Sequence, residues 1–142
     1  MIKKYFYRIQ NLDYRLFAIV ISCLLPLSAC KKPGIGGEAK ISGYVHVKKY
    51  NATFTQFLGE YPGKDLYVYI VFGNHNGYDK RIKTDYAGRF EFANLYKGDY
   101  TIYLYSRDSS LTDLSGIIPV TKQVLIEKFK SEVNLDTINI FQ

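Results

Sequence analysis

Between residue 39 and the C-terminus, apolar side chains recur at alternate positions. The segment Asp65–Phe72 shows the pattern most clearly, with Leu66, Val68, Ile70 and Phe72 in one phase and Tyr67, Tyr69 and Val71 in the other. A period of two is that of a β-strand with one buried face. No window from residue 39 onward carries the i, i+3, i+4, i+7 apolar stripe of a helix over three turns. The chain is therefore expected to fold as an all-β domain.

Clusters of Gly, Asn, Asp and Pro separate the alternating segments and define their limits. A long connection, Asn51–Gly63, follows the first segment, and a change of phase near Asp136 and Thr137 indicates a β-bulge in the last. Seven short strands in about 100 residues predict one antiparallel β-sandwich over residues 39–142. The strands are expected at Lys40–Tyr50, Asp65–Phe72, Lys80–Thr84, Arg89–Ala93, Tyr100–Arg107, Ile118–Glu127 and Glu132–Phe141, with Ile41, Tyr44 or Val45, Val47, Phe90, Phe92, Ile102 and Leu104 as core candidates.

The segment Thr84–Ile102 carries a more specific pattern. It fits T-D-x-x-G-x-F-x-F-x-x-L-x-x-G-x-Y-x-I and is preceded by Gly43-Tyr44-Val45 in an earlier strand. Over residues 39–110 the chain thereby resembles carboxypeptidase regulatory-like (transthyretin-like, prealbumin-like) domains. The resemblance implies a seven-stranded, Ig-like sandwich, a tyrosine-corner role for Tyr100, and little about function, because such folds carry many functions. A 5-hydroxyisourate hydrolase shares the wider fold, but its histidine pair and its C-terminal Tyr-Arg-Gly-Ser are absent here.

Residues 1–29 have the three parts of a secretory signal. Basic residues precede an apolar run, Leu16–Leu27, which ends in the small residues Ser28 and Ala29. Twelve helical residues extend about 18 Å, whereas the hydrocarbon core of a bilayer is about 30 Å thick. A cleaved signal peptide is therefore expected in place of a permanent transmembrane helix.

The tetrapeptide Leu27–Cys30 (LSAC) resembles the lipobox of bacterial lipoproteins. The resemblance implies cleavage before Cys30, a diacylglycerol thioether and an acylated (palmitate-bearing) amine on that residue, and a lipid-anchored protein of the cell envelope. Cys23 would leave with the signal, so the folded part would hold no disulfide. The glycine-rich residues 30–38 are expected to form a flexible tether. Lys31 favours the outer membrane, and the lack of a following acidic cluster favours its periplasmic side.

The mature 113 residues would carry fifteen Lys and Arg against twelve Asp and Glu. These scattered bases do not form the dense stripe of a nucleic-acid-binding protein. His46 and His75, with no cysteine in support, are a poor ligand set, so no metal or cofactor is expected. The loop Asp108–Asp113 matches no calcium motif, and no G-x-S-x-G occurs. The chain is therefore expected not to be an enzyme.

Four tyrosines fall in the phase opposite to the core: Tyr67, Tyr69, Tyr103 and Tyr105. If their two strands are neighbours, the side chains form an exposed aromatic ladder. Such a ladder can simply stabilise a solvent-facing sheet, but it can also anchor a protein partner or stack on sugar rings. The sequence thus predicts a non-catalytic, lipid-anchored envelope module for structure or protein interaction. The alternative is a carbohydrate- or peptidoglycan-binding module that uses this face.

Overall fold

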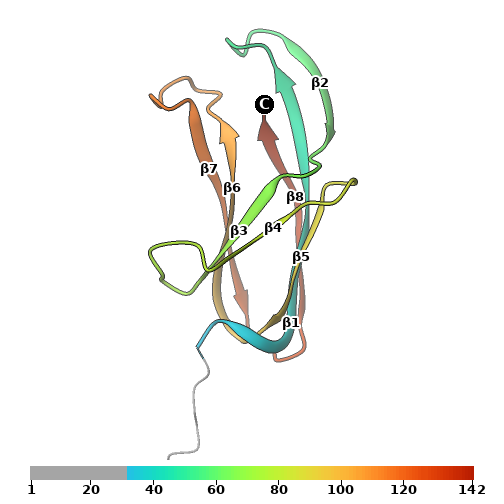
Figure 1. The fold of residues 1–142 in the computed structure, drawn as a ribbon, viewed down its shortest axis with the longest axis vertical. Coiled ribbons are helices and arrows are strands. Elements are labelled where there is room, and N and C mark those ends of the chain that lie inside the picture. The colour runs from blue at the N-terminus through green and yellow to red at the C-terminus, as the bar shows by residue number, and fades with distance from the viewer. Residues whose placement is uncertain (1–31) are drawn as a thin grey trace, which may run out of the picture. The chain divides into compact units, whose positions relative to one another are not determined.

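The computed structural model describes residues 32–142, and the signal peptide, Cys30 and Lys31 lie outside this range. The described residues form eight strands in two four-stranded sheets, which enclose one core (Figure 1). The described part of the chain contains no helix with the length and apolar character needed to cross a bilayer. The strands are β1 (Ile35–Tyr50), β2 (Phe57–Pro62), β3 (Tyr67–Phe72), β4 (Lys80–Lys83), β5 (Arg89–Leu95), β6 (Gly98–Arg107), β7 (Ile117–Ile126) and β8 (Glu132–Phe141).

The first sheet is built around the long strand β1. β5 pairs with the first part of β1 and β2 with its last part, both antiparallel. β8 pairs with β1 in parallel, from Lys40 opposite Glu132 to Lys48 opposite Phe141. The second sheet is antiparallel throughout, in the order β4-β3-β6-β7. The all-β, two-sheet prediction is confirmed, whereas the predicted uniform antiparallel pairing fails at β1–β8.

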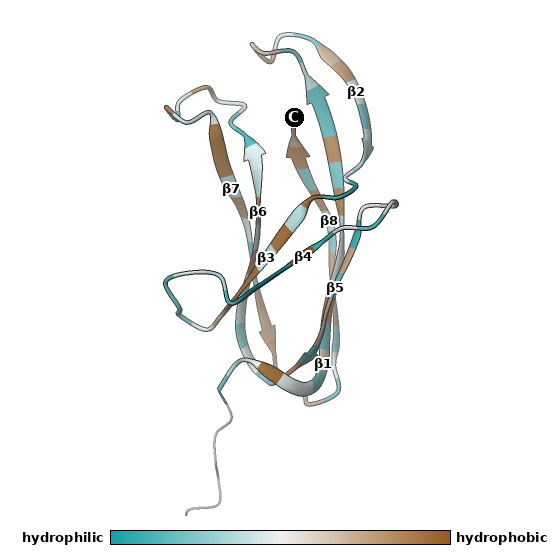
Figure 2. Ribbon diagram, in the orientation of Figure 1, coloured by the Kyte–Doolittle hydropathy of each residue, from teal (hydrophilic) through white to brown (hydrophobic). Residues whose placement is uncertain are grey.

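The core contains the residues that the alternation places on the inner faces. Phe92, Ile102 and Leu104 are at most 1% exposed, and Val45 is buried in preference to Tyr44. Each large apolar side chain that is fully buried contributes roughly 1.5–3 kcal/mol of transfer free energy. Figure 2 shows the apolar residues concentrated in the strands, with the β3–β4 loop and β4 largely hydrophilic.

The turn at residues 85–88 has the predicted chemistry. The Asp85 carboxylate accepts hydrogen bonds from the amides of Ala87 and Arg89, both at 2.8 Å. Gly88 has a φ of 77°, and a Cβ there would lie 2.4 Å from the carbonyl oxygen of Val45. Glycine is therefore required both by the backbone conformation and by the close approach of β1.

The predicted strand count of seven differs from the observed eight, because β2 lies inside the segment read as a long connection. Its residues are exposed on both faces, so burial imposes no alternation on its sequence. The hairpin that it forms with β1 is held at its end by an aromatic cluster. Tyr50 contacts Phe54, Phe57 and Phe141 with ring centroids 5.4–5.8 Å apart.

β1 begins at Ile35, so residues 35–38, assigned above to the tether, are part of a strand. A Cβ on Gly37 would lie 1.9 Å from the carbonyl oxygen of Leu95, and Gly36 has a φ of 117°. These glycines therefore allow β1 to cross close to the end of β5. Composition alone does not separate this use of glycine from flexibility.

The predicted bulge in the last strand is present. Gly43 pairs with Leu135 and Tyr44 with Thr137, which leaves Asp136 as the extra residue of β8. The bulge restores the phase that buries Ile138 and Ile140, each 1% exposed. It therefore explains how one strand serves the core on both sides of a phase change.

Candidate functional site

The four predicted tyrosines lie together on the outer face of the second sheet. β3 and β6 are neighbours, and Tyr69 lies directly opposite Tyr103. Tyr67 and Tyr105 are 42% and 52% exposed, whereas Tyr69 and Tyr103 are partly buried between their neighbours. The condition set for an aromatic ladder, adjacent strands, is therefore met.

Tyr69 is the centre of this group. Its ring stacks on that of Tyr103, with centroids 5.0 Å apart and planes inclined by only 10°. Tyr105 meets Tyr69 edge to face at 5.8 Å, and Tyr67 lies 6.3 Å away along the same strand. Ring pairs of this kind contribute roughly 0.5–1.5 kcal/mol beyond their buried area. The arrangement is thus one connected cluster.

The structure adds a fifth tyrosine that the alternation did not identify. Tyr78, from the loop between β3 and β4, packs edge to face on Tyr69 at 5.1 Å and is itself 50% exposed. A loop residue has no strand phase, so the sequence carried no signal for it. Tyr67, Tyr69, Tyr78, Tyr103 and Tyr105 are called the tyrosine face below.

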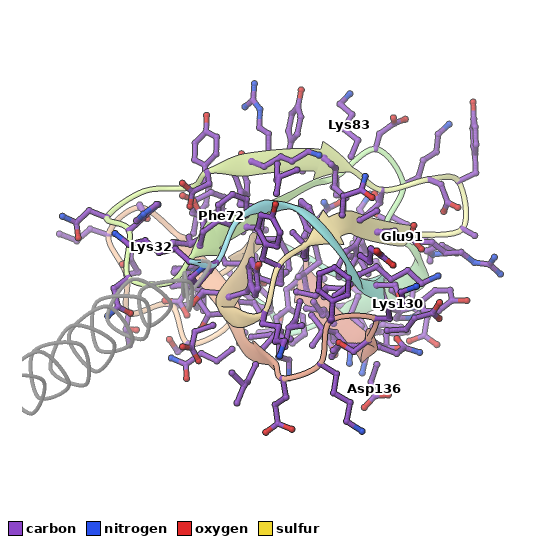
Figure 3. The ribbon with its side chains drawn as sticks, turned by 90° about the horizontal axis from the view of Figure 1, so that it is seen from below. Lys32, Phe72, Lys83, Glu91, Lys130 and Asp136 are labelled. Atoms are coloured by element: carbon purple, nitrogen blue, oxygen red, sulfur yellow. The ribbon has the colours of Figure 1, made fainter. Side chains whose placement is uncertain are left out.

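Two cations border the tyrosine face along the edge strand β4. The guanidinium carbon of Arg81 lies 4.5 Å from the ring centroid of Tyr67, and the Lys83 ammonium lies 5.3 Å from it. β4 pairs Arg81 with Tyr69 and Lys83 with Tyr67, which places both bases on the outer side of the sheet. Figure 3 shows Lys83 directed outward from the sheet. The face is therefore aromatic, hydroxyl-bearing and positively charged at one border.

The packing also changes the acidity of one phenol. Burial raises the pKa of Tyr103, and the adjacent phenols of Tyr105, Tyr69 and Tyr78 raise it further. The hydroxyl of Tyr103 is therefore protonated at neutral pH and can both donate and accept hydrogen bonds.

The two histidines lie in separate parts of the fold. His46, on β1, is paired with Glu60 at 3.3 Å, and His75, in the β3–β4 loop, is paired with Asp79 at 2.7 Å. Among residues 32–142, no group of three or more His, Cys, Asp or Glu side chains is arranged to hold a metal ion. Each histidine has a local structural partner.

The loop between β6 and β7 is organised around Asp108. Its carboxylate accepts hydrogen bonds from the amides of Ser110, Thr112 and Asp113, each at 2.8 Å. The Ser110 hydroxyl also donates to it, and these bonds hold the pKa of Asp108 well below its usual range. The carboxylate is only 2% exposed. The predicted solvated loop is therefore a tightly bonded one, in which Asp108 serves the backbone.

A groove of about 580 Å³ lies at the other open edge, between β4 and β5. Tyr44, 39% exposed, forms part of it, with Arg89 5.3 Å from its ring. Glu91 on the same side is paired with Lys40 at 3.6 Å. The Asp85 carboxylate in this groove is already committed to the turn described above. The groove thus offers a mixed polar surface without a free cluster of acids or nucleophiles.

Comparison with known proteins places the chain only by its architecture. No protein-family model matches the sequence, and no curated protein is detectably similar to it. A Pseudomonas aeruginosa protein, provisionally assigned as carbohydrate binding, is 18% identical with a TM-score of 0.43; the alignment covers 77% of this chain and 91% of that one. An (S)-allantoin synthase is 10% identical with a TM-score of 0.42, over 75% of this chain and 43% of the synthase. These similarities are too low to carry a functional argument.

Proposed function

We propose that this chain is a lipid-anchored, non-catalytic protein of the bacterial envelope that binds a protein partner through the tyrosine face. The observation that supports the proposal is the cluster centred on Tyr69, which exposes aromatic area and hydroxyl groups on one sheet. Tyrosine and arginine are enriched at the centres of protein interfaces because they offer large contact area together with hydrogen bonding. Arg81 at the border of the face adds charge to this surface.

The ring geometry favours a protein over a glycan. A sugar that stacks on an aromatic residue needs a free ring face, but Tyr69 and Tyr103 cover one face of each other. The Arg81 guanidinium covers one face of Tyr67. What the cluster offers to solvent is therefore largely ring edges and hydroxyls. Such groups fit a polar and aromatic protein surface better than the apolar side of a pyranose.

The anchor in this proposal is Cys30, for which the support is the sequence alone. Lipidation at Cys30 would hold the domain at a membrane, with the outer membrane and its periplasmic side as the proposed position. Two or more acyl chains are needed for stable attachment, as a lipoprotein cysteine would carry. A domain held there by lipid would present the tyrosine face to other envelope proteins.

The partner test compares two matched variants of the full chain expressed in envelope-containing cells. Tyr69→Ala combined with Tyr105→Ala removes the centre of the face, whereas Tyr86→Ala removes a tyrosine that is 81% exposed and outside it. Crosslinking followed by affinity capture should recover a protein with the wild type and with Tyr86→Ala, but not with the double variant. Equal recovery with all three would overturn the proposal.

The glycan alternative has its own measurement. Soluble peptidoglycan fragments should leave the tyrosine fluorescence of the wild-type protein unchanged if the face binds protein. Saturable quenching that is lost in the double variant would instead establish the sugar-binding function.

The anchor is tested by intact mass and membrane fractionation beside Cys30→Ser. A mature species that begins at an acylated Cys30, and that is absent from the variant, is expected. An uncleaved or unmodified chain would overturn the anchor and leave the partner test unaffected.

A further inference from the structure

The end of the domain at which the described chain begins is held rigidly. The Gly34 amide donates a hydrogen bond to the Tyr100 hydroxyl at 3.0 Å, and the Tyr96 amide donates to the Gly34 carbonyl at 3.0 Å. Pro33 packs so closely on Gly98 that a Cβ there would lie 2.4 Å from the proline Cγ. The chain is therefore docked from Pro33, only three positions after Cys30. At about 3.5 Å per residue, Cys30 stays within about 10 Å of this end.

The β7–β8 connection lies at the same end. Ile126, the last residue of β7, pairs with Gly98, and the Ser131 carbonyl accepts a hydrogen bond from the Lys40 amide near the start of β1. The connection carries Phe129, which is 45% exposed and stands between Lys128 and Lys130 in the sequence. Figure 3 looks onto this end of the molecule, where Lys32 and Lys130 are both visible.

Other residues at this end have the same two characters. Ile35, at the start of β1, is 51% exposed. Lys97 is exposed in the turn between β5 and β6. Two acids accompany them: Glu38, paired with Lys130 at 3.0 Å, and Glu127, at the start of the connection. Exposed apolar groups and lysines thus occur together, in excess of the acids beside them.

The opposite end of the strands provides the contrast. Its β6–β7 loop also exposes apolar side chains, Leu111 and Leu114, the first 60% and the second fully exposed. The same loop, residues 108–116, contains two aspartates and no lysine or arginine. Exposed apolar residues therefore occur at both ends, but lysines accompany them only in the connection at the end where the chain enters the domain.

We infer that this entry end, formed by Ile35, Lys97, Lys128, Phe129 and Lys130, rests on an anionic lipid surface. Apolar side chains insert at the boundary between head groups and acyl chains, and lysines beside them are attracted by anionic head groups. The inference rests on the proposed anchoring, because the short link to Cys30 is what brings this end to the bilayer. The strands then run away from the membrane, and the tyrosine face remains on a side of the domain where a partner can reach it.

The test uses the lipidated full-length product reconstituted into vesicles of phosphatidylcholine with phosphatidylglycerol. Phe129→Cys carries an environment-sensitive fluorophore, and Leu114→Cys at the opposite end is the matched control. Cys23 leaves with the signal and Cys30 is acylated, so the label reacts at one position. The probe at 129 should shift to the blue and be quenched by spin-labelled lipid, whereas the probe at 114 should report water. The additional changes Lys128→Glu and Lys130→Glu should reduce the shift.

The possible failures are distinguishable. Protein that floats with the vesicles while the probe at 129 reports water would overturn the inference and leave the anchor intact. Equal insertion of both probes would also overturn it, because the orientation would then be unspecific. Protein that does not float with vesicles would overturn the anchor and the inference together, with the tyrosine-face proposal still open to its own experiment.

Discussion

The hydroxyl of Tyr100 accepts a hydrogen bond at 3.0 Å from the amide of Gly34, which lies 66 residues earlier in the chain. The same hydroxyl donates to the Tyr96 carbonyl at 2.8 Å, while the ring is 1% exposed in the core. Burial outweighs these hydrogen bonds and raises the pKa of Tyr100. One side chain thus joins the core, the β5–β6 turn and the point at which the chain enters the domain.

We expect Tyr100→Phe to destabilise the domain by about 1–3 kcal/mol, because the change keeps the ring but leaves polar backbone groups without their partner. Chemical denaturation measures the loss. Tyr86→Phe is the control, and since its ring is 81% exposed it should change the free energy of unfolding by less than about 0.5 kcal/mol. Equal effects of the two changes would contradict this role for the Tyr100 hydroxyl.

The two faces of the second sheet and its partner predict different mutational costs. Phe92→Ala should cost about 3–5 kcal/mol, because it opens a cavity in the closed core. Tyr103→Ala should cost about 1 kcal/mol, the worth of its cross-strand and ring contacts. Thermal or denaturant unfolding of both variants checks the difference. A loss for Tyr103→Ala as large as that for Phe92→Ala would show that the tyrosine face is primarily structural.

The β6–β7 loop should confer a pH-dependent part of the stability. Because the pKa of Asp108 is lowered in the folded state, its contribution is complete above the ordinary aspartate value of about 3.9 and is lost as the pH falls below it. Asp108→Asn should therefore be less stable than the wild type at neutral pH, and the difference should shrink on acidification. Ser109→Ala, in the same loop, should show a constant difference from the wild type. A difference for Asp108→Asn that is independent of pH would rule out this linkage.

The tyrosine face should be visible in the titration of Tyr103. Burial and the adjacent phenols raise its pKa, so Tyr69→Ala, which uncovers its ring, should lower the pKa of Tyr103 toward the ordinary value of about 10. NMR titration of labelled tyrosine rings measures the change. An unchanged pKa of Tyr103 would show that Tyr69 does not shield it.

The sequence supplied much of the candidate site but not its assembly. Alternation placed Tyr67, Tyr69, Tyr103 and Tyr105 on one phase of two strands, and the structure brings those strands together. Tyr78 escaped prediction because it lies in a loop, where no period applies. Arg81 and Lys83 escaped because a border of charge beside aromatic rings depends on which strand lies next to which.

What the sequence determined by itself is local: the alternation that separates Phe92 and Ile102 from the outer residues, the Asp85–Gly88 turn, and the bulge at Asp136. Each is written in neighbouring residues, because strand phase and turn conformation depend on a few consecutive side chains. Tertiary structure alone decided the parallel pairing of β1 with β8, the strand formed at Gly36 and Gly37, and the stacking of Tyr69 on Tyr103. These depend on contacts between residues far apart in the chain, which alternation does not encode.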